Sequence, residues 1–383
     1  MSVTAAKGFS AAGIAAGIKD NGNPDLALVR NLGPDHTAAA VFTSNRVKAA
    51  PVQWTQQVIK DQKLQAVILN SGGANACTGP DGFADTHRTA EETATALGIG
   101  AIDVAVCSTG VIGVRLPLDK IISGVPGLVA ASGPDNGGDA ARAIMTTDSR
   151  PKQAIASGDG WTIGGMAKGA GMLAPGLATM LVVITTDAVI AGDELDQALR
   201  AATSVTFDRV DSDGCMSTND TVLVMSSGAS GVTPPWGDFN AALTAVCHDL
   251  ARQLHGDAEG ASHEIVINIA GAASEDEAVM IGRTIARNNL FKCAIFGNDP
   301  YWGRVLAAIG TTDATFEPDQ IDVSFNGILM SRGGTLAGPD ASVDISGREV
   351  VVDVDLHAGE HGATIRTNDL TYDYVKENAE YTS

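Results

Sequence analysis

The sequence is poor in cysteine, in aromatic residues and in basic side chains, and each shortage excludes a class of protein. Five scattered cysteines without a C-x-x-C pair do not build a disulfide framework, so they indicate reduced, mostly buried thiols of a cytoplasmic protein. The 25 Lys and Arg are outnumbered by 45 Asp and Glu, which gives a formal net charge of −20. Nucleic acids and anionic membranes attract clustered positive charge, so neither is expected as a partner.

The chain also lacks the marks of a secreted or a disordered protein. Its first residues, MSVTAAKGFSAAG, contain no basic region followed by an apolar block, so no secretory signal is expected. Hydrophobic residues make up 44% of the chain, which is enough for a packed core. The length of 383 residues favours one large layered domain or two domains. The 44 glycines, with only 4% aromatics, indicate many tight turns and close backbone approaches.

One uncharged run, between Gly169 and Thr186, is long enough to resemble a membrane span. This stretch, GAGMLAPGLATMLVVITT, has 18 residues, about the lower limit for a spanning helix. Three glycines and Pro175 interrupt its first half, and Lys168 and Asp187 bound it closely. It therefore predicts a buried loop that continues into a buried strand, and no membrane span is expected.

Strand and helix signals alternate along the chain, without an internal repeat or a low-complexity linker. Apolar and alternating runs predict strands at 26–30 and 38–43, joined by a Gly-Pro-Asp turn, and at 66–69, 104–107, 265–269, 321–327 and 350–356. A helix is predicted at 83–97, which is rich in Ala, Glu and Thr, and another at 117–132 with a break at Pro126. Helical spacing predicts a helix at 239–255, and a Ser274/Glu277 capping box indicates one at 274–289. The dipeptide Asn326-Gly327 indicates a hairpin. Together these signals predict a mixed α/β chain with hairpins, not a regular βαβ array.

Neither a nucleotide-binding loop nor a metal-ligand motif is present. G-x-x-x-x-G-K-[ST] is absent and no G-x-G-x-x-G follows a strand, so the glycines near Lys168 are interpreted as turn and packing glycines. His248 and His255 share a helix face, with Glu259 and His263 nearby, but without H-E-x-x-H they do not indicate a metal site. No metal and no organic cofactor is therefore expected.

The most informative position is the junction of Ala178 and Thr179, where a Gly/Pro loop meets an apolar strand. One interpretation is structural: Thr179 begins a core strand, for which threonine has a high propensity. The other is chemical, because a threonine that becomes a new N-terminus carries its own base, an α-amino group with a pKa of about 8. Backbone cleavage between Ala178 and Thr179 would create that nucleophile. Spacing alone favours the structural interpretation.

Around this junction the sequence KGAGMLAPGLATML resembles the self-cleaving ornithine acetyltransferase family of arginine biosynthesis. The resemblance covers essentially the whole chain. It is carried further by AAPV at 49–52, CSTGVIG at 107–113, AIMTTD at 143–148, STND at 217–220, DAEG at 257–260, DPYWGR at 299–304 and NAEYTS at 378–383.

The resemblance implies roles for individual residues. Thr179 matches the nucleophile, which attacks the peptide bond before it and later the acetyl donor. Thr109 and Gly110 match the pair that stabilises the oxyanion, since a hydroxyl and a backbone N–H at a strand end can converge on developing charge. Lys168 matches a substrate-binding lysine, whose ammonium suits the α-carboxylate shared by acetylornithine and glutamate.

Further substrate contacts are implied at Thr146, Thr147, Glu259, Asn378 and Ser383. The Glu259 carboxylate suits the side-chain amine of ornithine, whereas the residues alone do not say which of the two threonines meets the ligand. Contacts at Asn378 and Ser383 require a C-terminus that is tied down, because chain ends normally fray.

The chain departs from the family pattern at three positions, none of which is the nucleophile or the oxyanion pair. Gly73 stands where Asn is expected, so the resemblance does not predict the hydrogen bonds of the loop at 70–76. Tyr301 also replaces an expected Asn. Ser383 stands where Thr is frequent and keeps a hydroxyl.

The resemblance implies a ping-pong acetyltransferase of the N-terminal-nucleophile type. Thr179 takes acetyl from N2-acetylornithine, releases ornithine, and passes the acetyl group to L-glutamate to give N-acetylglutamate. The implied fold is a layered αββα sandwich with a smaller C-terminal α/β portion. Cleavage would give an α chain, 1–178, and a β chain, 179–383, which form one intertwined unit and assemble as a cytoplasmic α2β2 heterotetramer.

Three alternatives differ in the acetyl donor, in the acceptor or in the class of protein. A bifunctional enzyme would also acetylate glutamate from acetyl-CoA. An N-terminal-nucleophile aminopeptidase of similar architecture would use water as the acceptor, and would be expected to have Ser at the cleavage point. A membrane-associated or scaffold protein would be anchored by the apolar stretch at 169–186.

Overall fold

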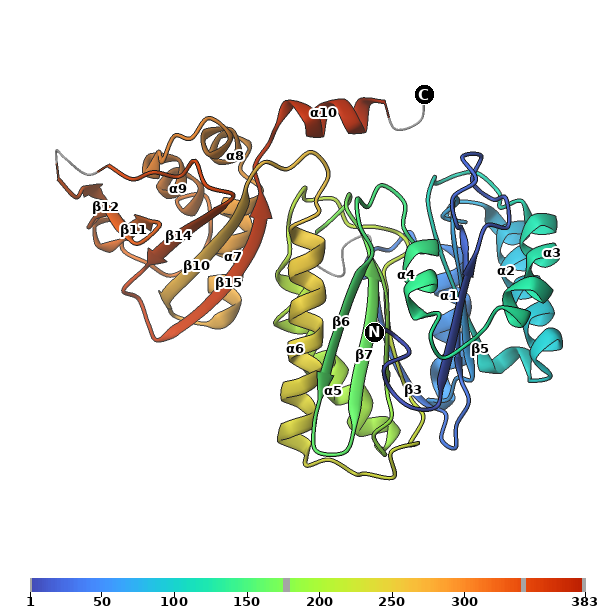
Figure 1. Ribbon diagram of the computed structural model, residues 1–383. Helices are drawn as coiled ribbons and strands as arrows, with labels where there is room; N and C mark the ends of the chain where they lie inside the picture. The colour runs from blue at the N-terminus through green and yellow to red at the C-terminus, as the bar shows by residue number, and fades with distance from the viewer. Residues whose placement is uncertain (1, 175–179, 339–341, 381–383) are drawn as a thin grey trace. The chain divides into compact units, whose positions relative to one another are not determined.

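The computed structural model describes residues 2–174, 180–338 and 342–380, which fall into two compact units (Figure 1). The larger unit contains the described residues of 2–170, 180–208 and 216–257. The smaller unit contains 171–174, 209–215 and the described residues from Ala258 onward. Each unit has a hydrophobic core of its own.

The larger unit is built on two β-sheets. The first sheet has the order β1-β2-β4-β5, with β1 Phe9–Ile14, β2 Leu26–Asn31, β4 Ala66–Ser71 and β5 Val104–Thr109. The second has the order β3-β9-β8-β7-β6, with β3 Thr37–Phe42, β9 Thr221–Ser226, β8 Leu181–Thr186, β7 Thr162–Lys168 and β6 Lys152–Ser157. The predicted strands at 26–30 and 38–43 are confirmed, but β2 and β3 belong to different sheets, because each finds its hydrogen-bond partners elsewhere.

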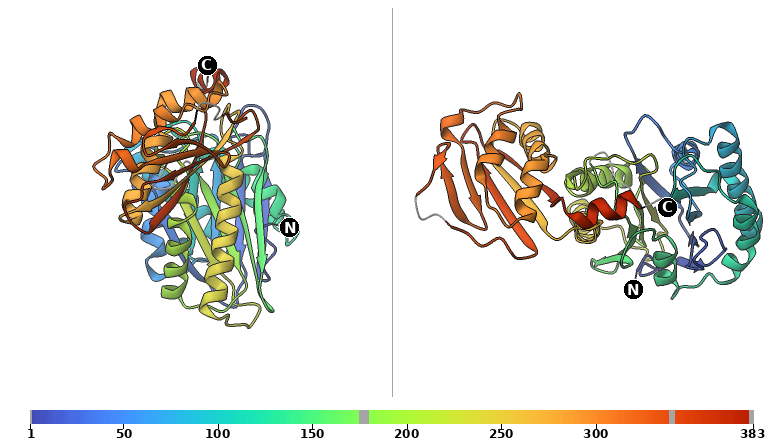
Figure 2. Two further views of the ribbon diagram at one scale, coloured as in Figure 1. Left: turned by 90° about the vertical axis from the view of Figure 1, so that its left-hand side faces the viewer. Right: turned by 90° about the horizontal axis from the view of Figure 1, so that it is seen from above.

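Alternation of side chains along the strands gives the larger unit its layers. Val29 of β2 points into a core that also contains Leu181 and Val183 of β8, so the two sheets pack face to face. Leu28, one residue earlier, points to the outer face, where it packs with Ala90 of a covering helix. Helices α2 Gly79–Leu97 and α3 Leu118–Ala130 cover the first sheet, and α5 Gly192–Ser204 and α6 Trp236–His255 cover the second (Figures 1 and 2). The predicted αββα layering is confirmed.

The smaller unit is built on one six-stranded sheet. Helices lie against this sheet in both figures. Its order is β13-β12-β11-β14-β10-β15, with β10 Glu264–Ala272, β11 Asp322–Phe325, β12 Ile328–Arg332, β13 Thr335–Leu336, β14 Glu349–Asp355 and β15 His361–Asn368. Helices α7 Glu275–Ala286, α8 Asn289–Phe296 and α9 Trp302–Ile309 contribute to its apolar core. Helix α10, Tyr372–Ala379, follows β15, and Tyr372 contacts Phe296 edge-on.

Local signals account for several of these elements. The Ser274 hydroxyl accepts the Glu277 N–H at 3.2 Å, so the predicted N-terminal cap of α7 is confirmed. The helix ends at Ala286, before the predicted 289, because the Asn288 side chain accepts the Phe291 N–H and starts α8. Asn326 and Gly327 both have positive φ and join β11 to β12, as predicted.

The predicted break at Pro126 is wrong, because α3 runs through this residue. A proline removes one hydrogen bond and crowds the preceding turn. The neighbouring Gly124 and Gly127 carry no side chain to add to that crowding. Buried Ile121, Val125 and Leu128 hold the helix against the first sheet.

The uncharged run that resembled a membrane span includes a buried strand. All six residues of β8 are buried between β7 and β9. In the described part of the chain, no helix combines the length and the apolar character needed to cross a membrane.

Candidate active site

The predicted oxyanion pair lies at the end of β5. Thr109 is 2% exposed, and its carbonyl accepts the N–H groups of Gly72 and Gly73 at 2.9 and 3.0 Å. Gly110 has a φ of 136°, and a Cβ there would lie 2.4 Å from the Gly73 nitrogen. Only glycine fits this corner, because both the conformation and the close backbone approach exclude a side chain.

The loop containing Gly73, where the family pattern has Asn, is held by hydrogen bonds from neighbouring side chains. Asn70 donates its side-chain amide to the Gly73 carbonyl at 3.1 Å, and the Ser108 hydroxyl donates to the Asn70 amide oxygen at 2.5 Å. A Cβ at Gly73 would lie 2.6 Å from the Leu116 side chain, so the leucine leaves no room for a larger residue at this position. Glycine in place of Asn at position 73 therefore leaves the backbone around Thr109 and Gly110 ordered.

Lys168 and Thr109, which the resemblance assigns to one site, lie together. Lys168 is the last residue of β7, is 2% exposed, and donates to the Thr109 hydroxyl at 3.4 Å. A buried ammonium beside a threonine hydroxyl, at the strand end where Gly110 follows, can hold a carboxylate or a developing oxyanion. The net charge of −20 thus does not prevent a buried ammonium from lying at the candidate site.

Asp148 is a charged neighbour of Lys168 to which the sequence assigned no role. Its buried carboxylate contacts the ammonium of Lys152 at 2.6 Å, the Gly169 N–H at 2.6 Å and the Lys168 ammonium at 3.9 Å. Burial alone would raise the pKa of Asp148, but the two ammonium groups and the Gly169 N–H outweigh it and bring the pKa to about 2. Asp148 therefore stays ionised and holds Lys168 in place.

The two predicted threonines lie next to this charged group. Thr146 is half-buried and donates its backbone N–H to Asp148 at 2.9 Å, whereas Thr147, the next residue, is exposed. The structure thus brings Thr146, Lys168 and Thr109 into one region of the larger unit. It does not distinguish the two threonines as substrate contacts.

Ala178, Thr179 and Ser383 lie outside the described residues. Met180, which follows Thr179 in the chain, is 1% exposed and donates its N–H to the Asp220 carboxyl at 3.1 Å. Leu181 pairs with Lys168 in the β7–β8 register. Fragments separated at the junction of Ala178 and Thr179 would therefore share the five-stranded sheet.

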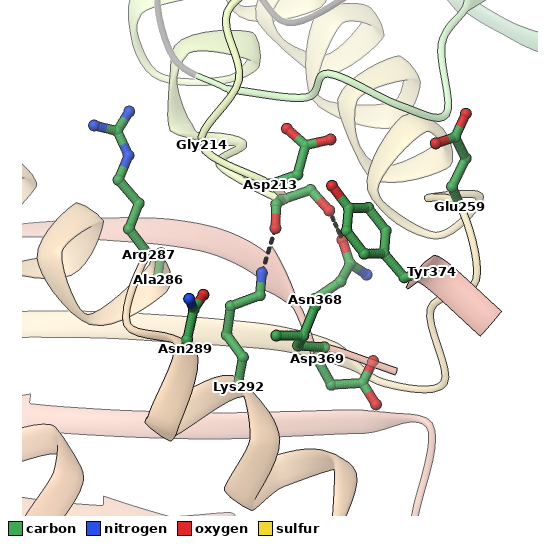
Figure 3. Close-up of a pocket in the computed structure, with 12 residues that line it drawn as sticks. Asp213, Gly214, Glu259, Ala286, Arg287, Asn289, Lys292, Asn368, Asp369 and Tyr374 are labelled. Atoms are coloured by element: carbon green, nitrogen blue, oxygen red, sulfur yellow. Dashed lines mark hydrogen bonds between the residues drawn. The ribbon is translucent and has the colours of Figure 1, made fainter. Parts of the chain in front are cut away.

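The remaining two predicted contacts belong to the smaller unit, where Glu259 lines a pocket of about 470 Å³ (Figure 3). Asn378 donates its amide to the Glu259 carboxylate at 3.1 Å. Asp213 and Tyr374 line the same pocket, and burial together with the Asp213 and Glu259 carboxylates raises the pKa of Tyr374 to about 12. Burial lowers the pKa of Lys292, also in this pocket, to about 8. The pocket therefore offers acids and one readily deprotonated amine.

Comparison with known proteins gives matches over the full length of the chain. The model of the ArgJ family matches residues 10–383. The chain is 64% identical to the arginine biosynthesis bifunctional protein ArgJ of Streptomyces coelicolor, over all of both proteins. It is 57% identical to the protein of that name from Mycobacterium leprae, over all of this chain and 96% of the relative.

Among solved structures, an ornithine acetyltransferase from Mycobacterium tuberculosis, complexed with ornithine, is similar. The two sequences are 61% identical, and the match covers 47% of this chain and 96% of the chain in that structure. The superposition has a TM-score of 0.45. The family match and the full-length identities show that the chain belongs to the ArgJ family.

Proposed function

We propose that this acetyltransferase of arginine biosynthesis transfers acetyl from N2-acetylornithine to L-glutamate through an ester on Thr179. Family membership supports the reaction, because the chain matches ArgJ relatives from end to end. The observation that carries the proposed site is the buried contact between Lys168 and Thr109 at 3.4 Å, beside a corner that only Gly110 can occupy. Such a site suits a substrate with a carboxylate and an intermediate with an oxyanion.

The enzyme first makes its own nucleophile. The Thr179 hydroxyl attacks the carbonyl carbon of Ala178, the C–N bond between them breaks, and the nitrogen takes the hydroxyl proton. Water then hydrolyses the resulting ester, which leaves a carboxylate on Ala178 and a free α-amine and hydroxyl on Thr179. The fragments are 1–178 and 179–383, held together by the pairing of β7 with β8.

Acetyl transfer then follows two similar steps. The α-amine of Thr179 accepts the hydroxyl proton as the oxygen attacks the acetyl carbonyl, and Thr109 with the Gly110 N–H stabilises the oxyanion. The proton passes to the departing nitrogen of ornithine. Glutamate attacks the acetyl ester by the reverse sequence, and N-acetylglutamate leaves.

Recognition in this proposal uses charges of both signs. Lys168 binds the α-carboxylate that acetylornithine and glutamate share. Glu259 and Asn378 bind the ornithine end, Thr146 or Thr147 adds a hydroxyl contact, and Ser383 contributes from the C-terminus. The enzyme acts in the cytoplasm as an α2β2 heterotetramer.

Mass spectrometry of the purified protein tests this function. Under denaturing conditions the wild-type protein should give two masses that correspond to 1–178 and 179–383. After brief exposure to N2-acetylornithine, the second fragment should gain the mass of one acetyl group, which glutamate then removes. An intact chain in an active preparation, or acetyl on another fragment, would contradict the proposal.

Gly110→Ala tests the oxyanion corner. The new Cβ would lie 2.4 Å from the Gly73 nitrogen, so the Gly110 N–H must move. We expect kcat for transfer to fall by about 100-fold, the usual effect of losing one oxyanion donor, with a much smaller change in KM. Gly113→Ala is the matched control, because Gly113 also has a positive φ but a Cβ there meets nothing within 4 Å. Equal kinetics in the two variants would contradict the assignment.

A second activity, acetylation of glutamate from acetyl-CoA, is favoured by the word "bifunctional" in the names of the relatives. We propose that the same ester on Thr179 forms from this donor. Incubation with acetyl-CoA and glutamate, without acetylornithine, should give N-acetylglutamate and free thiol in equal amounts. Absence of both products from an enzyme active with acetylornithine would exclude this activity.

A further inference from the structure

Lys19 brings a second ammonium to the region of Lys168, the proposed binder of the substrate α-carboxylate. Lys19 is half-buried in the connection between β1 and β2, and its Nζ donates to the carbonyls of Pro24 and Met145 at 3.0 and 2.7 Å. Met145 directly precedes Thr146, a predicted substrate contact. The head of the Lys19 side chain is therefore fixed beside the proposed site.

The stem of Lys19 lies beside the loop that contacts the proposed oxyanion strand. A Cβ at Gly72 would lie 3.4 Å from the Lys19 Cγ. The N–H of Gly72 donates to the Thr109 carbonyl at 2.9 Å. The side chain thus extends from the end of β5 to the turn at 145–148, in the region of the larger unit that contains Thr109 and Lys168.

A buried carboxylate holds the backbone of Lys19 in this position. The Asp25 side chain is 0% exposed. It accepts the backbone N–H groups of Ala16, Ile18 and Lys19 at 2.6, 2.6 and 2.9 Å. Hydrogen bonds to a charged acceptor are strong, so the point from which the Lys19 side chain extends is fixed.

The ammonium of Lys19 forms no ion pair within the described part of the chain. Its two acceptors there are neutral carbonyls, and no carboxylate of the described residues lies within ion-pair distance of it. The Asp148 carboxylate, which also lies in this region, is bound by Lys152 and by the Gly169 N–H, both at 2.6 Å. The Lys19 ammonium can therefore take a carboxylate from a ligand.

The charges around Lys19 agree with such a role. Burial lowers the pKa of Lys19, and the carboxylates of Asp25 and Asp148 oppose this effect. Lys168 lowers the pKa of Lys19 further, so the two ammonium groups lie close enough to repel each other. A bound carboxylate would relieve this repulsion and stabilise the charged form of Lys19.

The two substrates of the proposed reaction differ in their charges. N2-acetylornithine carries one carboxylate, and its side chain ends in an ammonium. Glutamate carries two carboxylates, of which Lys168 accounts for the one that both substrates share. A second carboxylate that loses water on binding is costly unless a cation pairs with it.

Resting on the proposed function, we propose that Lys19 binds the side-chain carboxylate of glutamate and makes the enzyme specific for this acceptor. Lys168 and Lys19 then hold the α-carboxylate and the side-chain carboxylate of one glutamate molecule. Acetylornithine lacks the second carboxylate. Lys19 therefore contributes to the deacetylation of the enzyme by glutamate and not to its acetylation.

Lys19→Met tests this inference through the two halves of the reaction. In a ping-pong mechanism, kcat/KM for each substrate depends only on the half-reaction in which that substrate takes part. We expect kcat/KM for glutamate to fall by about 10- to 100-fold, mainly through KM, because a hydrogen bond between charged groups is lost. The value for N2-acetylornithine should stay nearly constant, which also shows that the variant is folded.

Glutamine serves as a second acceptor, because it has the length of glutamate and a neutral amide in place of the side-chain carboxylate. The wild-type protein should prefer glutamate to glutamine by kcat/KM, and Lys19→Met should lose most of that preference. Lys19→Gln is measured in parallel. It keeps a side-chain N–H donor but carries no charge, and it must show the same loss.

Lys120→Met is the matched control. Lys120 is exposed, lies on α3 and donates to the carbonyl of Gly17, in the same connection between β1 and β2 as Lys19. Its substitution removes an ammonium that contacts this connection from the exposed side. The preference for glutamate over glutamine should therefore stay as in the wild-type protein.

The outcomes separate this inference from the proposed function. If the wild-type protein does not transfer acetyl from N2-acetylornithine to glutamate, the proposed function fails and the inference fails with it. If the wild-type protein does so and the Lys19 variants keep the preference for glutamate over glutamine, only the inference is overturned. Equal losses of kcat/KM for acetylornithine and for glutamate, or a lost preference in Lys120→Met as well, also overturn it.

Discussion

Replacing Thr179 with Ala should leave the chain uncleaved and abolish acetyl transfer. The substitution removes the hydroxyl that attacks the carbonyl of Ala178, so neither the peptide bond nor the acetyl donor meets a nucleophile. We expect one mass for 1–383 under denaturing conditions and a loss of turnover of about 10⁴-fold or more, as for other enzymes deprived of their nucleophile.

Two variants serve as controls for this experiment. Thr179→Ser keeps a hydroxyl and should cleave and transfer at a measurable rate. Thr185→Ala removes a buried hydroxyl from β8, where Thr185 donates to the Val3 carbonyl at 2.6 Å, and should cost stability without blocking cleavage. A Thr179→Ala protein that still yields two fragments, or that transfers acetyl, would remove Thr179 from the mechanism.

Replacing Asp148 with Asn should destabilise the larger unit and weaken substrate binding. The carboxylate is the buried partner of Lys152 at 2.6 Å and lies 3.9 Å from the Lys168 ammonium. Loss of one partner from a buried ion pair costs about 3–5 kcal/mol, because the remaining charge stays buried. Here Asp257 still pairs with Lys152, so we expect the low end of that range. KM for acetylornithine should rise, since Lys168 loses the anion that holds it.

The pH dependence of unfolding identifies the cause of this effect. The pKa of Asp148 is lowered to about 2 in the folded protein, so its stabilisation is fully present above the ordinary pKa near 4 and is lost as the pH falls through about 2. The stability difference between wild type and Asp148→Asn, measured with denaturant, should be constant above about pH 5 and shrink toward pH 2. Asp187→Asn is the control, because Asp187 is also buried and accepts the N–H groups of Lys7 and Thr162 at 3.0 and 2.7 Å. A difference that persists at pH 2 would show that packing, not charge, is responsible.

Patterns within short segments predicted much of the fold. The spacing of Leu243, Val246 and Leu250 predicted α6, and Asn326-Gly327 predicted the hairpin of β11 and β12. The uncharged run at 169–186 predicted a buried strand, and β8 confirms it. These features depend on side-chain periodicity and backbone preference over a few residues, which a sequence displays directly.

The roles of the candidate site residues stay predictions. The structure shows that Lys168 contacts Thr109 and that Glu259 contacts Asn378, all four of which the resemblance names. The roles of Thr179, Ala178 and Ser383 stay predictions, because these residues lie outside the described part of the chain. Asp148 and Asp220 received no role from the sequence, because an acidic residue in so acidic a chain carries no signal of its own.

The sequence by itself therefore determined the mixed α/β character, the strand that follows Thr179 and the residues that resemble an acetyltransferase site. Only the tertiary structure decided that β2 and β3 separate into two sheets, that α3 continues through Pro126, and that Asp220 meets the N–H of Met180, 40 residues away. The scarcity of basic residues likewise did not exclude a buried ammonium at Lys168. The reason is physical: hydrogen-bond partners, burial and the pKa of a carboxyl group depend on which distant segments pack together.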